Sequence, residues 1–391
     1  MKSIYLDHSA TTPVDKEVLS AMLPYFSEIY GNASSLHSFG QDSKNALDEA
    51  RDIVAKAFNA ESNEIYFTSG GTESDNWALK GYAYANKAKG NHIITTAVEH
   101  PAILETCKQL ENNGFSITYL PVDNEGFVTA KQVEESITEN TILVSVMMVN
   151  NEIGNIMPIK EIGELCRSRK IAFHTDAVQA CGTIDIDVKD MKIDMMSISS
   201  HKIYGPKGVG ILFRRRGIKL QNFMSGGEQE RGFRAGTTNT PGIVGFAKAL
   251  EITKRDLAAN NAHIKEVRDY FIKKMSENIK GIILNGPKKE NFDRRSVNNA
   301  NYSFKCIEGE AVLLRLDLSG VAVSSGSACS SGSLEPSHVL LATGMPLEQA
   351  HSSIRFSFGK NNTLKEVDEV VEKLVEIVES LRKLSPIKME E

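Results

Sequence analysis

The stretch EIYFTSGGTESDNWALKGYAYA, residues 64–85, joins a short apolar run to a helical pattern through two glycines. Residues 64–69 predict a β-strand that stops at Gly70 and Gly71, and residues 76–85 predict the helix that follows. A strand that leads through glycine directly into a helix is typical of α/β proteins. This stretch therefore predicts an α/β fold.

Strand and helix patterns alternate on both sides of this stretch, from about residue 40 to residue 250. An apolar stripe at helical spacing runs through Ala46, Leu47, Ala50, Ile53, Val54, Ala57 and Phe58. Further strands are predicted at 91–98, 116–122, 142–149, 171–176 and 194–199. We therefore expect a mostly parallel central sheet flanked by helices. Ligands bind at the carboxyl edge of such sheets, and the polar residues expected there are His100, Asn150, Asp176 and His201.

The pattern changes after about residue 250. The predicted elements are a long helix at 243–280, a segment rich in Gly, Pro and Asn at 284–295, and short strands at 297–304 and 354–359. Thr363 and Glu366 form a capping-box pattern for a last helix, which should end before Pro386. These elements predict a smaller α+β domain. We expect residues 14–255 to form the large domain, and residues 1–13 with 256–391 to form the small one.

The composition excludes some classes of protein. The chain has 391 residues, of which 41% are hydrophobic and 24% charged, as in ordinary globular proteins. Its formal net charge of −5 argues against nucleic-acid binding and against attachment to an anionic membrane surface. The N-terminus lacks the apolar core of a signal peptide, and the apolar runs are too short to span a bilayer. We expect a cytoplasmic protein.

The five cysteines favour reduced thiols over disulfides. Their number is odd, and no two stand in a C-x-x-C pattern. Four lie in or beside apolar or helical patterns and are predicted to be buried: Cys107, Cys166, Cys181 and Cys306. Only Cys329 lies in a polar loop of small residues, within VAVSSGSACSSGSLEPSH at 321–338.

The segment SGGTES, residues 69–74, has the composition of an anion-binding turn. Glycines let the backbone approach a ligand closely. The N-terminus of the following helix offers free N–H groups and the positive end of its dipole to a phosphate, and Thr72 can add a hydroxyl. A plain strand–helix turn without a ligand explains the segment equally well.

A lysine stands beside a predicted strand end in SISSHKIYGPKGVG, residues 197–210. Lys202 falls where the strand meets a glycine-rich turn, close to the ligand-binding edge of the sheet. Its position is compatible with a phosphate contact, a surface charge or a Schiff-base nucleophile. Taken alone, a solvated loop lysine is the simplest of these interpretations.

Asp176 ends the predicted strand within FHTDAVQACG, residues 173–182, three residues before Gln179. A carboxylate at a buried sheet edge needs a cationic or protonated partner. The alternative is an N-cap for a following helix. Pyridoxal 5'-phosphate (PLP) needs a phosphate site, an amine that forms an imine, and a carboxylate that keeps its pyridine nitrogen protonated. Thr72, Lys202 and Asp176 together therefore suggest PLP as the ligand.

The chain resembles the cysteine desulfurases of the NifS and IscS type, within the class V aminotransferase family. The motifs that carry the resemblance are YLDHSATTP (5–13), GNASSLHSFG (31–40), FTSGGTESDN (67–76), EHPAI (99–103), NNEIG (150–154), HTDAVQ (174–179), SSHKIYGPKG (199–208), RAGTTN (234–239), SSGSACSSGSLEPSH (324–338) and IRFSFGKNNT (354–363). One departure is Ala33, where the family pattern has proline. The resemblance implies the aspartate aminotransferase-like fold of PLP enzymes (fold type I), with the Cys329 loop in the small domain.

For the cofactor, the resemblance implies that Lys202 forms the Schiff base, Asp176 pairs with the pyridinium nitrogen and Gln179 hydrogen-bonds the ring oxygen. His100 would stack on the ring and exchange protons with the substrate. The other cofactor-binding residues that it implies are Gly71, Thr72, Asn151, Ser199, His201 and Thr237. Because Thr237 would reach the phosphate of the neighbouring subunit, a homodimer is expected.

For the reaction, the resemblance implies that Asn151 and Arg355, with Asn32 nearby, bind the carboxylate of L-cysteine. The Cys329 thiolate would attack the substrate sulfur and carry it as a persulfide, and L-alanine would leave. The long small-residue loop resembles loops that deliver sulfur directly to an acceptor, such as an iron–sulfur scaffold or a tRNA-modifying protein.

Two alternatives use the same residues differently. A selenocysteine lyase or a class V aminotransferase would need the cofactor site but not Cys329. A non-catalytic scaffold that binds partners through its C-terminal helix would need neither, and the presence of Lys202, Asp176 and His100 argues against it. No nucleic acid, membrane or metal is expected to bind.

Overall fold

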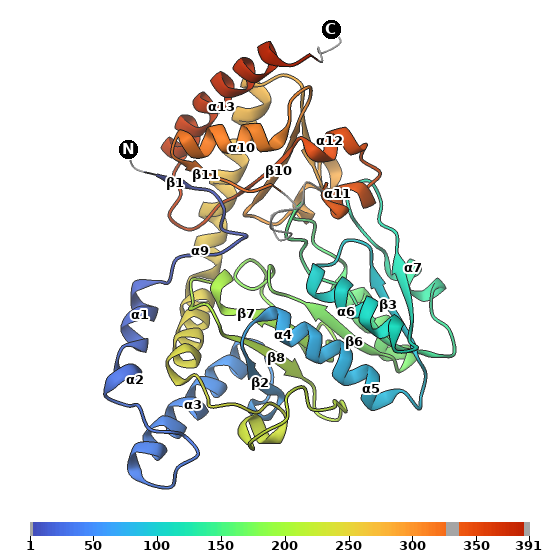
Figure 1. The fold of residues 1–391 in the computed structure, drawn as a ribbon, viewed down its shortest axis with the longest axis vertical. Coiled ribbons are helices and arrows are strands. Elements are labelled where there is room, and N and C mark those ends of the chain that lie inside the picture. The colour runs from blue at the N-terminus through green and yellow to red at the C-terminus, as the bar shows by residue number, and fades with distance from the viewer. Residues whose placement is uncertain (1–2, 326–335, 387–391) are drawn as a thin grey trace.

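The computed structural model describes residues 3–325 and 336–386 (Figure 1). Its centre is a seven-stranded sheet with the strand order β2-β8-β7-β6-β5-β3-β4. These strands are β2 (Ile65–Thr68), β3 (His92–Thr96), β4 (Ser116–Leu120), β5 (Thr141–Ser145), β6 (Ala172–Asp176), β7 (Met195–Ser199) and β8 (Gly210–Arg214). Neighbouring strands are parallel, except that β8 runs antiparallel to both β2 and β7. The predicted mostly parallel central sheet is confirmed.

The helices cover both faces of this sheet because its strands alternate their side chains between two apolar clusters. One face packs against α1 (Lys16–Met22), α3 (Ser38–Ala57), α7 (Ala130–Glu135), α8 (Ile159–Arg169) and the first half of α9 (Thr240–Asn278). The other packs against α4 (Gly71–Asn76), the π-helical segment η2 (Trp77–Gly81), α5 (Tyr82–Asn86) and α6 (Pro101–Asn112). The alternation is visible in pairs such as Ile94 with Ile93 and Phe173 with Ala172: the first member belongs to the apolar cluster that includes α3, and the second belongs to the cluster that includes α6.

A smaller antiparallel sheet lies at the other end of the molecule, at the top of Figure 1. It consists of β9 (Ile282–Asn285), β10 (Asn299–Phe304) and β12 (Ser353–Ser357), in the order β12-β10-β9. The helices of this half are α10 (Gly309–Leu318), α11 (His338–Ala342), α12 (Leu347–His351) and α13 (Leu364–Leu384). The N-terminal strand β1 (Ile4–Tyr5) pairs with β11 (Val321–Ala322), and α2 (Pro24–Ser27) follows α1.

Helix α9 belongs to both halves. It has 39 residues, and its buried side chains up to Ile252 join the core beneath the large sheet, whereas those from Ile264 onward join the core of the small sheet. Figure 1 shows it running the length of the molecule. The domain boundary at residue 255 stays a prediction.

The last helix follows its predicted capping box. The Thr363 hydroxyl accepts a hydrogen bond from Glu366 N–H at 3.2 Å, and the Glu366 carboxylate accepts one from Thr363 N–H at 3.0 Å. The helix ends at Leu384, before Pro386, as predicted.

Three of the four cysteines that were predicted to be buried are buried, namely Cys107, Cys166 and Cys181. Burial raises the pKa of each to about 12. The prediction for Cys306 is wrong, because this residue is half-buried in the turn after β10, with a φ of +66°. Over residues 3–325 and 336–386, no helix has the length and apolarity needed to span a bilayer.

Candidate active site

Lys202 lies in a short 3₁₀ turn directly after β7, at the carboxyl edge of the large sheet. Its ammonium Nζ donates hydrogen bonds to the carbonyl oxygens of Ser9 at 2.5 Å and Ala10 at 2.8 Å. Its charge acts on the pKa values of Asp176, His100 and His201. The structure therefore brings these four side chains together, and the interpretation of Lys202 as a solvated loop lysine is wrong.

Asp176 is the last residue of β6 and is only 6% exposed. Burial raises its pKa to about 6, against the opposing effects of the Val178 N–H group, which donates to Oδ1 at 2.9 Å, and of the Lys202 charge. Its carboxyl is therefore ionised at neutral pH. The alternative role as a helix N-cap is wrong, because the chain continues in turns and the next helical segment is the 3₁₀ turn Ser200–Lys202, after β7.

The N-terminal segment at residues 9–12 forms one wall of the site. The Gln179 side-chain amide donates to the same Ser9 carbonyl as Lys202, at 2.9 Å. The His201 Nδ1 atom lies 3.1 Å from the Thr11 hydroxyl. Sequence reasoning assigned no site residue to this segment, although the motif YLDHSATTP was the signal that could have found it.

The predicted phosphate turn is the first turn of α4, since the helix begins at Gly71 rather than after residue 74. A Cβ atom on Gly71 would lie 2.7 Å from Val178 Cγ2 and 3.7 Å from Ser199 Cβ, so only glycine lets the helix start this close to both neighbours. The N-cap, Gly70, contributes no side-chain hydrogen bond. The first N–H groups of the helix are thus left for another acceptor, beside the buried Ser199 and the exposed Thr72.

His100 is the N-cap of α6, and its Nδ1 atom accepts the Ala102 N–H at 3.1 Å. Burial, together with the positive charges of Lys202 and His338, lowers its pKa to about 4. His100 is therefore neutral at pH 7, and because Nδ1 is an acceptor, the ring proton sits on Nε2. The side chain presents an N–H donor to the site.

Arg355 and Asn151 meet where the two halves of the molecule join. Arg355 is on β12, an edge strand of the small sheet, yet it is only 2% exposed. Its guanidinium donates to the Asn151 carbonyl at 3.0 Å and to Asp7 Oδ1 at 2.9 Å, and its Nε has no partner within the described chain. The interpretation of Arg355 as a surface charge is wrong.

Two predicted site residues lie outside this cluster. Asn32 is exposed in the connection between α2 and α3, where its side chain accepts Ser34 N–H at 2.9 Å. That connection lies at the lower end of Figure 1, far from the small sheet. Thr237 is exposed in the segment before α9, which is tied to α4 by a bidentate pair between Arg234 and Glu73 at 2.8 and 3.1 Å.

Cys329 lies outside the described residues, but the chain on both sides of its segment contacts the site. Ser324 exchanges backbone hydrogen bonds with Arg355. On the other side, the Ser337 hydroxyl donates to the buried carboxyl of Glu152, and the His338 Nε2 atom lies 3.0 Å from the Glu99 carbonyl. The chain before the Cys329 segment thus contacts Arg355, and the chain after it contacts Glu99, the neighbour of His100.

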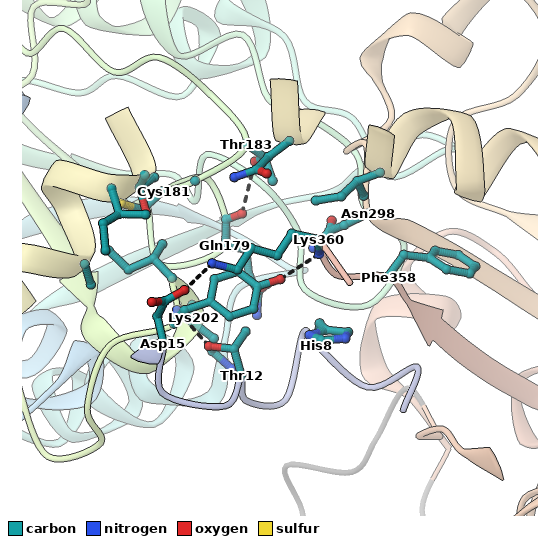
Figure 2. A pocket seen from close by; sticks show the side chains of 18 of the residues that line it. His8, Thr12, Asp15, Gln179, Cys181, Thr183, Lys202, Asn298, Phe358 and Lys360 are labelled. Atoms are coloured by element: carbon teal, nitrogen blue, oxygen red, sulfur yellow. Dashed lines mark hydrogen bonds and ion pairs between the residues drawn. The ribbon is translucent and has the colours of Figure 1, made fainter. Parts of the chain in front are cut away.

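A pocket adjoins Lys202 and Gln179 (Figure 2). Its other walls come from the N-terminal segment, from α9 and from Tyr204, Phe358 and Lys360. Lys360 forms an ion pair with Asp15 at 2.5 Å across this pocket. Asp176, His100 and Arg355 do not line this pocket, so it adjoins Lys202 from the side of the N-terminal segment and α9.

These groups fit PLP. A lysine amine, a buried ionised carboxylate, and a glycine-led helix start with free N–H groups beside a buried serine are the three features that this cofactor requires. Fold and site together define an enzyme of the PLP-dependent type.

Comparison with known proteins identifies the family. The family model for class-V aminotransferases matches residues 4–370, and the chain belongs to this family. It is 56% identical to the cysteine desulfurase IscS of Clostridium botulinum, over 99% of this chain and 97% of that protein. It is 52% identical to the cysteine desulfurase IscS of Methanosarcina thermophila, over 99% and 94%.

Solved structures agree with this result. A NifS-like protein superimposes with a TM-score of 0.90 at 37% identity, over 97% of this chain and 100% of that one. SspA in complex with cysteine superimposes with a TM-score of 0.81 at 37% identity, over 92% and 100%. The suspected resemblance, the PLP cofactor and the enzyme class are confirmed.

Proposed function

We propose that this cysteine desulfurase works through Lys202, Asp176, His100 and Cys329, and that it moves the sulfur of L-cysteine onto Cys329 while L-alanine leaves. The observation that carries the proposal is the convergence of Lys202, Asp176 and His100 at one sheet edge, between the two ends of the Cys329 segment. Each of these groups has a distinct task.

Bound PLP supplies an electron sink for negative charge that develops on the substrate Cα atom. Lys202 would hold the cofactor covalently, and its amine, when free, would take the proton from Cα. Asp176 keeps a proton on the ring nitrogen, because an ionised carboxylate buried at 6% exposure favours a cation beside it. The first turn of α4, Ser199 and His201 hold the phosphate.

His100 is a donor before it is a base. Its neutral ring carries the proton on Nε2 and uses Nδ1 to cap α6. It can therefore protonate or hydrogen-bond a sulfur or carbon atom of the substrate, and it takes up a proton only after giving one away. A neutral donor beside Lys202 also avoids placing two positive charges together.

Arg355 and Asn151 position the substrate carboxylate. A guanidinium matches a carboxylate in a two-bond fork, and the unpartnered Nε of Arg355 is a donor still to be satisfied. Asp7 already accepts from this guanidinium, so it holds the fork in place for the substrate.

The sulfur step balances without an outside oxidant. The Cys329 thiolate attacks the substrate sulfur and forms an S–S bond, the substrate Cβ–S bond breaks, and Cβ gains a proton to become the methyl group of L-alanine. Sulfur is oxidised and carbon reduced within the same step.

Delivery and assembly form the finer part of the proposal. The persulfide would pass to an acceptor protein, such as an iron–sulfur scaffold, in the cytoplasm. The enzyme would be a homodimer in which Thr237 reaches the partner's phosphate site. In support, α1 to α3 and their connections expose a set of large apolar side chains, namely Leu19, Leu23, Phe26, Tyr30, Leu36 and Phe39.

The test is alanine production from L-cysteine with a reductant, for the unchanged enzyme, Cys329→Ser, and Cys306→Ser as a matched control. We expect the unchanged enzyme and Cys306→Ser to produce alanine, and Cys329→Ser to lose at least about 100-fold of the rate because the nucleophile is gone. Equal rates in all three would instead indicate a lyase that does not use Cys329. Loss in both variants would indicate a folding defect, which circular dichroism would detect.

A further inference from the structure

A second aspartate lies on the same face of the large sheet as Asp176. Asp75 is on α4 and is 1% exposed. Its Oδ1 atom has no hydrogen-bond partner within the described chain and lies 3.7 Å from His174 Nε2. His174 and Asp176 are two residues apart on β6 and therefore point to the same face. The proposed function assigns no role to Asp75 or His174.

A chain of hydrogen bonds connects this pair to the sheet. His174 is fully buried, with Nδ1 2.9 Å from the Ser145 hydroxyl and Nε2 3.1 Å from the Ser197 hydroxyl. Ser197 hydrogen-bonds the Asp75 carboxyl. With Asp75 protonated, one direction satisfies this chain: the Asp75 O–H donates to Ser197, Ser197 donates to His174 Nε2, and His174 Nδ1–H donates to Ser145. In this direction His174 is neutral.

The two carboxyls differ in the cations and donors that they receive. Asp176 has the Val178 N–H group and the Lys202 charge, and it would gain the ring N–H of the cofactor. Among the described residues, Asp75 has only the Ser197 hydroxyl as a hydrogen-bond partner, and it faces two further acids, Asp176 and Glu99, and the neutral His174. Two neighbouring buried carboxylates with so few cations and hydrogen-bond donors around them do not both ionise.

We propose that Asp75 is a positioning residue that stays a neutral acid near Asp176, so that Asp176 is the single ionised carboxylate of this buried face. The inference rests on the proposed role of Asp176. Its consequence is charge balance: one negative charge meets one pyridinium, and no second buried anion competes for the ring proton or distorts the position of Asp176.

The test uses Asp75→Asn, which copies the shape and neutrality of the protonated acid. PLP affinity is measured by titrating the cofactor into the cofactor-free enzyme, and thermal stability of the cofactor-free enzyme is measured from pH 5 to pH 9. The comparison variants are Asp176→Asn and Asp194→Asn. Asp194 is a buried aspartate directly before β7. It is paired with Arg215 at 2.5 Å and Arg167 at 2.9 Å, so its carboxylate has two cationic partners.

We expect Asp75→Asn to bind PLP within about threefold of the unchanged enzyme, and Asp176→Asn to bind at least about tenfold more weakly. The stability readout has a definite sign. Burial and the neighbouring Asp176 raise the pKa of Asp75 well above its ordinary value. The folded state therefore holds a proton that the unfolded state releases, and stability falls as pH rises above about 4. Asp75→Asn should lack this loss and become relatively more stable toward pH 9, whereas Asp194→Asn should be less stable throughout.

Each contrary outcome is distinct. If Asp75→Asn weakens PLP binding tenfold while Asp176→Asn does the same, Asp75 acts as an anion and the inference is wrong. If Asp176→Asn leaves PLP binding unchanged, the proposed function itself is wrong at Asp176. Should Asp75→Asn not fold, Ser197→Ala replaces it: loss of this hydroxyl beside a neutral Asp75 should leave PLP affinity within about threefold, whereas an ionised Asp75 would lose the hydroxyl that stabilises its charge and affinity would fall.

Discussion

Arg355 joins three distant parts of the chain through one guanidinium. It is on β12, it donates to Asn151 after β5, and it pairs with Asp7 near the N-terminus. A lysine would keep the charge but lose the planar fork, because an ammonium is a point charge on a flexible stem. Arg355→Lys should therefore raise KM for L-cysteine by about 10-fold or more while PLP affinity stays unchanged.

Arg268→Lys is the matched control for this change. Arg268 is equally buried, at 1% exposure, but it lies on α9 and donates to the Ser296 carbonyl at 3.0 Å, outside the site. It should lower the melting temperature without changing KM. Steady-state kinetics and thermal melting separate the two effects, and an unchanged KM in Arg355→Lys would remove Arg355 from substrate binding.

At the scale of residues, the sequence could predict those groups whose immediate neighbours in the chain indicate their chemistry. Lys202 stands between a strand end and a glycine turn, and Asp176 ends an apolar strand. Asp7 and Asp75 could not be predicted in this way, because their partners, Arg355 and Ser197, are supplied by chain 348 and 122 residues away. Burial of Arg355 was missed for the same reason.

At the scale of elements, the site depends on how closely α4 approaches the turn after β6. A Cβ atom on Gly71 would lie 2.7 Å from Val178 Cγ2, so Gly71→Ala should push the helix start and the Asp176 turn apart. We expect PLP affinity to fall by about 10-fold, since cofactor contacts on both elements must then readjust. Val178→Ala alone should have little effect, and the double variant should recover to within about threefold.

Gly114→Ala provides a control for glycine replacement as such. Gly114 has a φ of +84° and open space around its Cβ position, so its replacement strains the backbone without touching the site. It should lower stability and leave PLP affinity unchanged. Cofactor titration of all four variants is the measurement. A double variant as weak as Gly71→Ala would show that the contact with Val178 is not the cause.

The elements themselves were largely predictable where periodicity is strong. Strands β2, β3, β4, β6 and β7 appear where they were expected, with no end shifted by more than two residues. The predicted strand at 142–149 ends at Ser145, although Val146 and Met148 still donate to β6 carbonyls at 3.1 and 2.8 Å. Strand β8 was missed, because it follows a glycine-rich turn and is antiparallel to both neighbours, outside the repeating strand–helix pattern.

At the scale of the whole molecule, the site is assembled from two cores. Lys202, Asp176 and His100 belong to the large sheet, whereas Arg355 belongs to the small one. Helix α9 holds the two cores at a fixed separation, and between Ile252 and Ile264 its side chains are exposed or only half-buried. A change in the segment of α9 between Ile252 and Ile264 should therefore alter the position of one core relative to the other without exposing either core to solvent.

Ala258 is exposed in the middle of this bridge. Proline there removes a helix hydrogen bond and clashes with the preceding turn, at a cost of about 3 kcal/mol, and it bends the helix. Ala258→Pro should keep PLP affinity within about threefold, because the proposed cofactor site lies on the large core, yet raise KM for L-cysteine by about 10-fold as Arg355 shifts relative to Lys202. Ala258→Gly, which costs about 1 kcal/mol without a bend, should leave both values unchanged. Cofactor titration and steady-state kinetics on the three proteins decide the matter: parallel loss of PLP binding and KM in Ala258→Pro would mean that α9 supports the large core itself, and that the two halves of the site are not independently built.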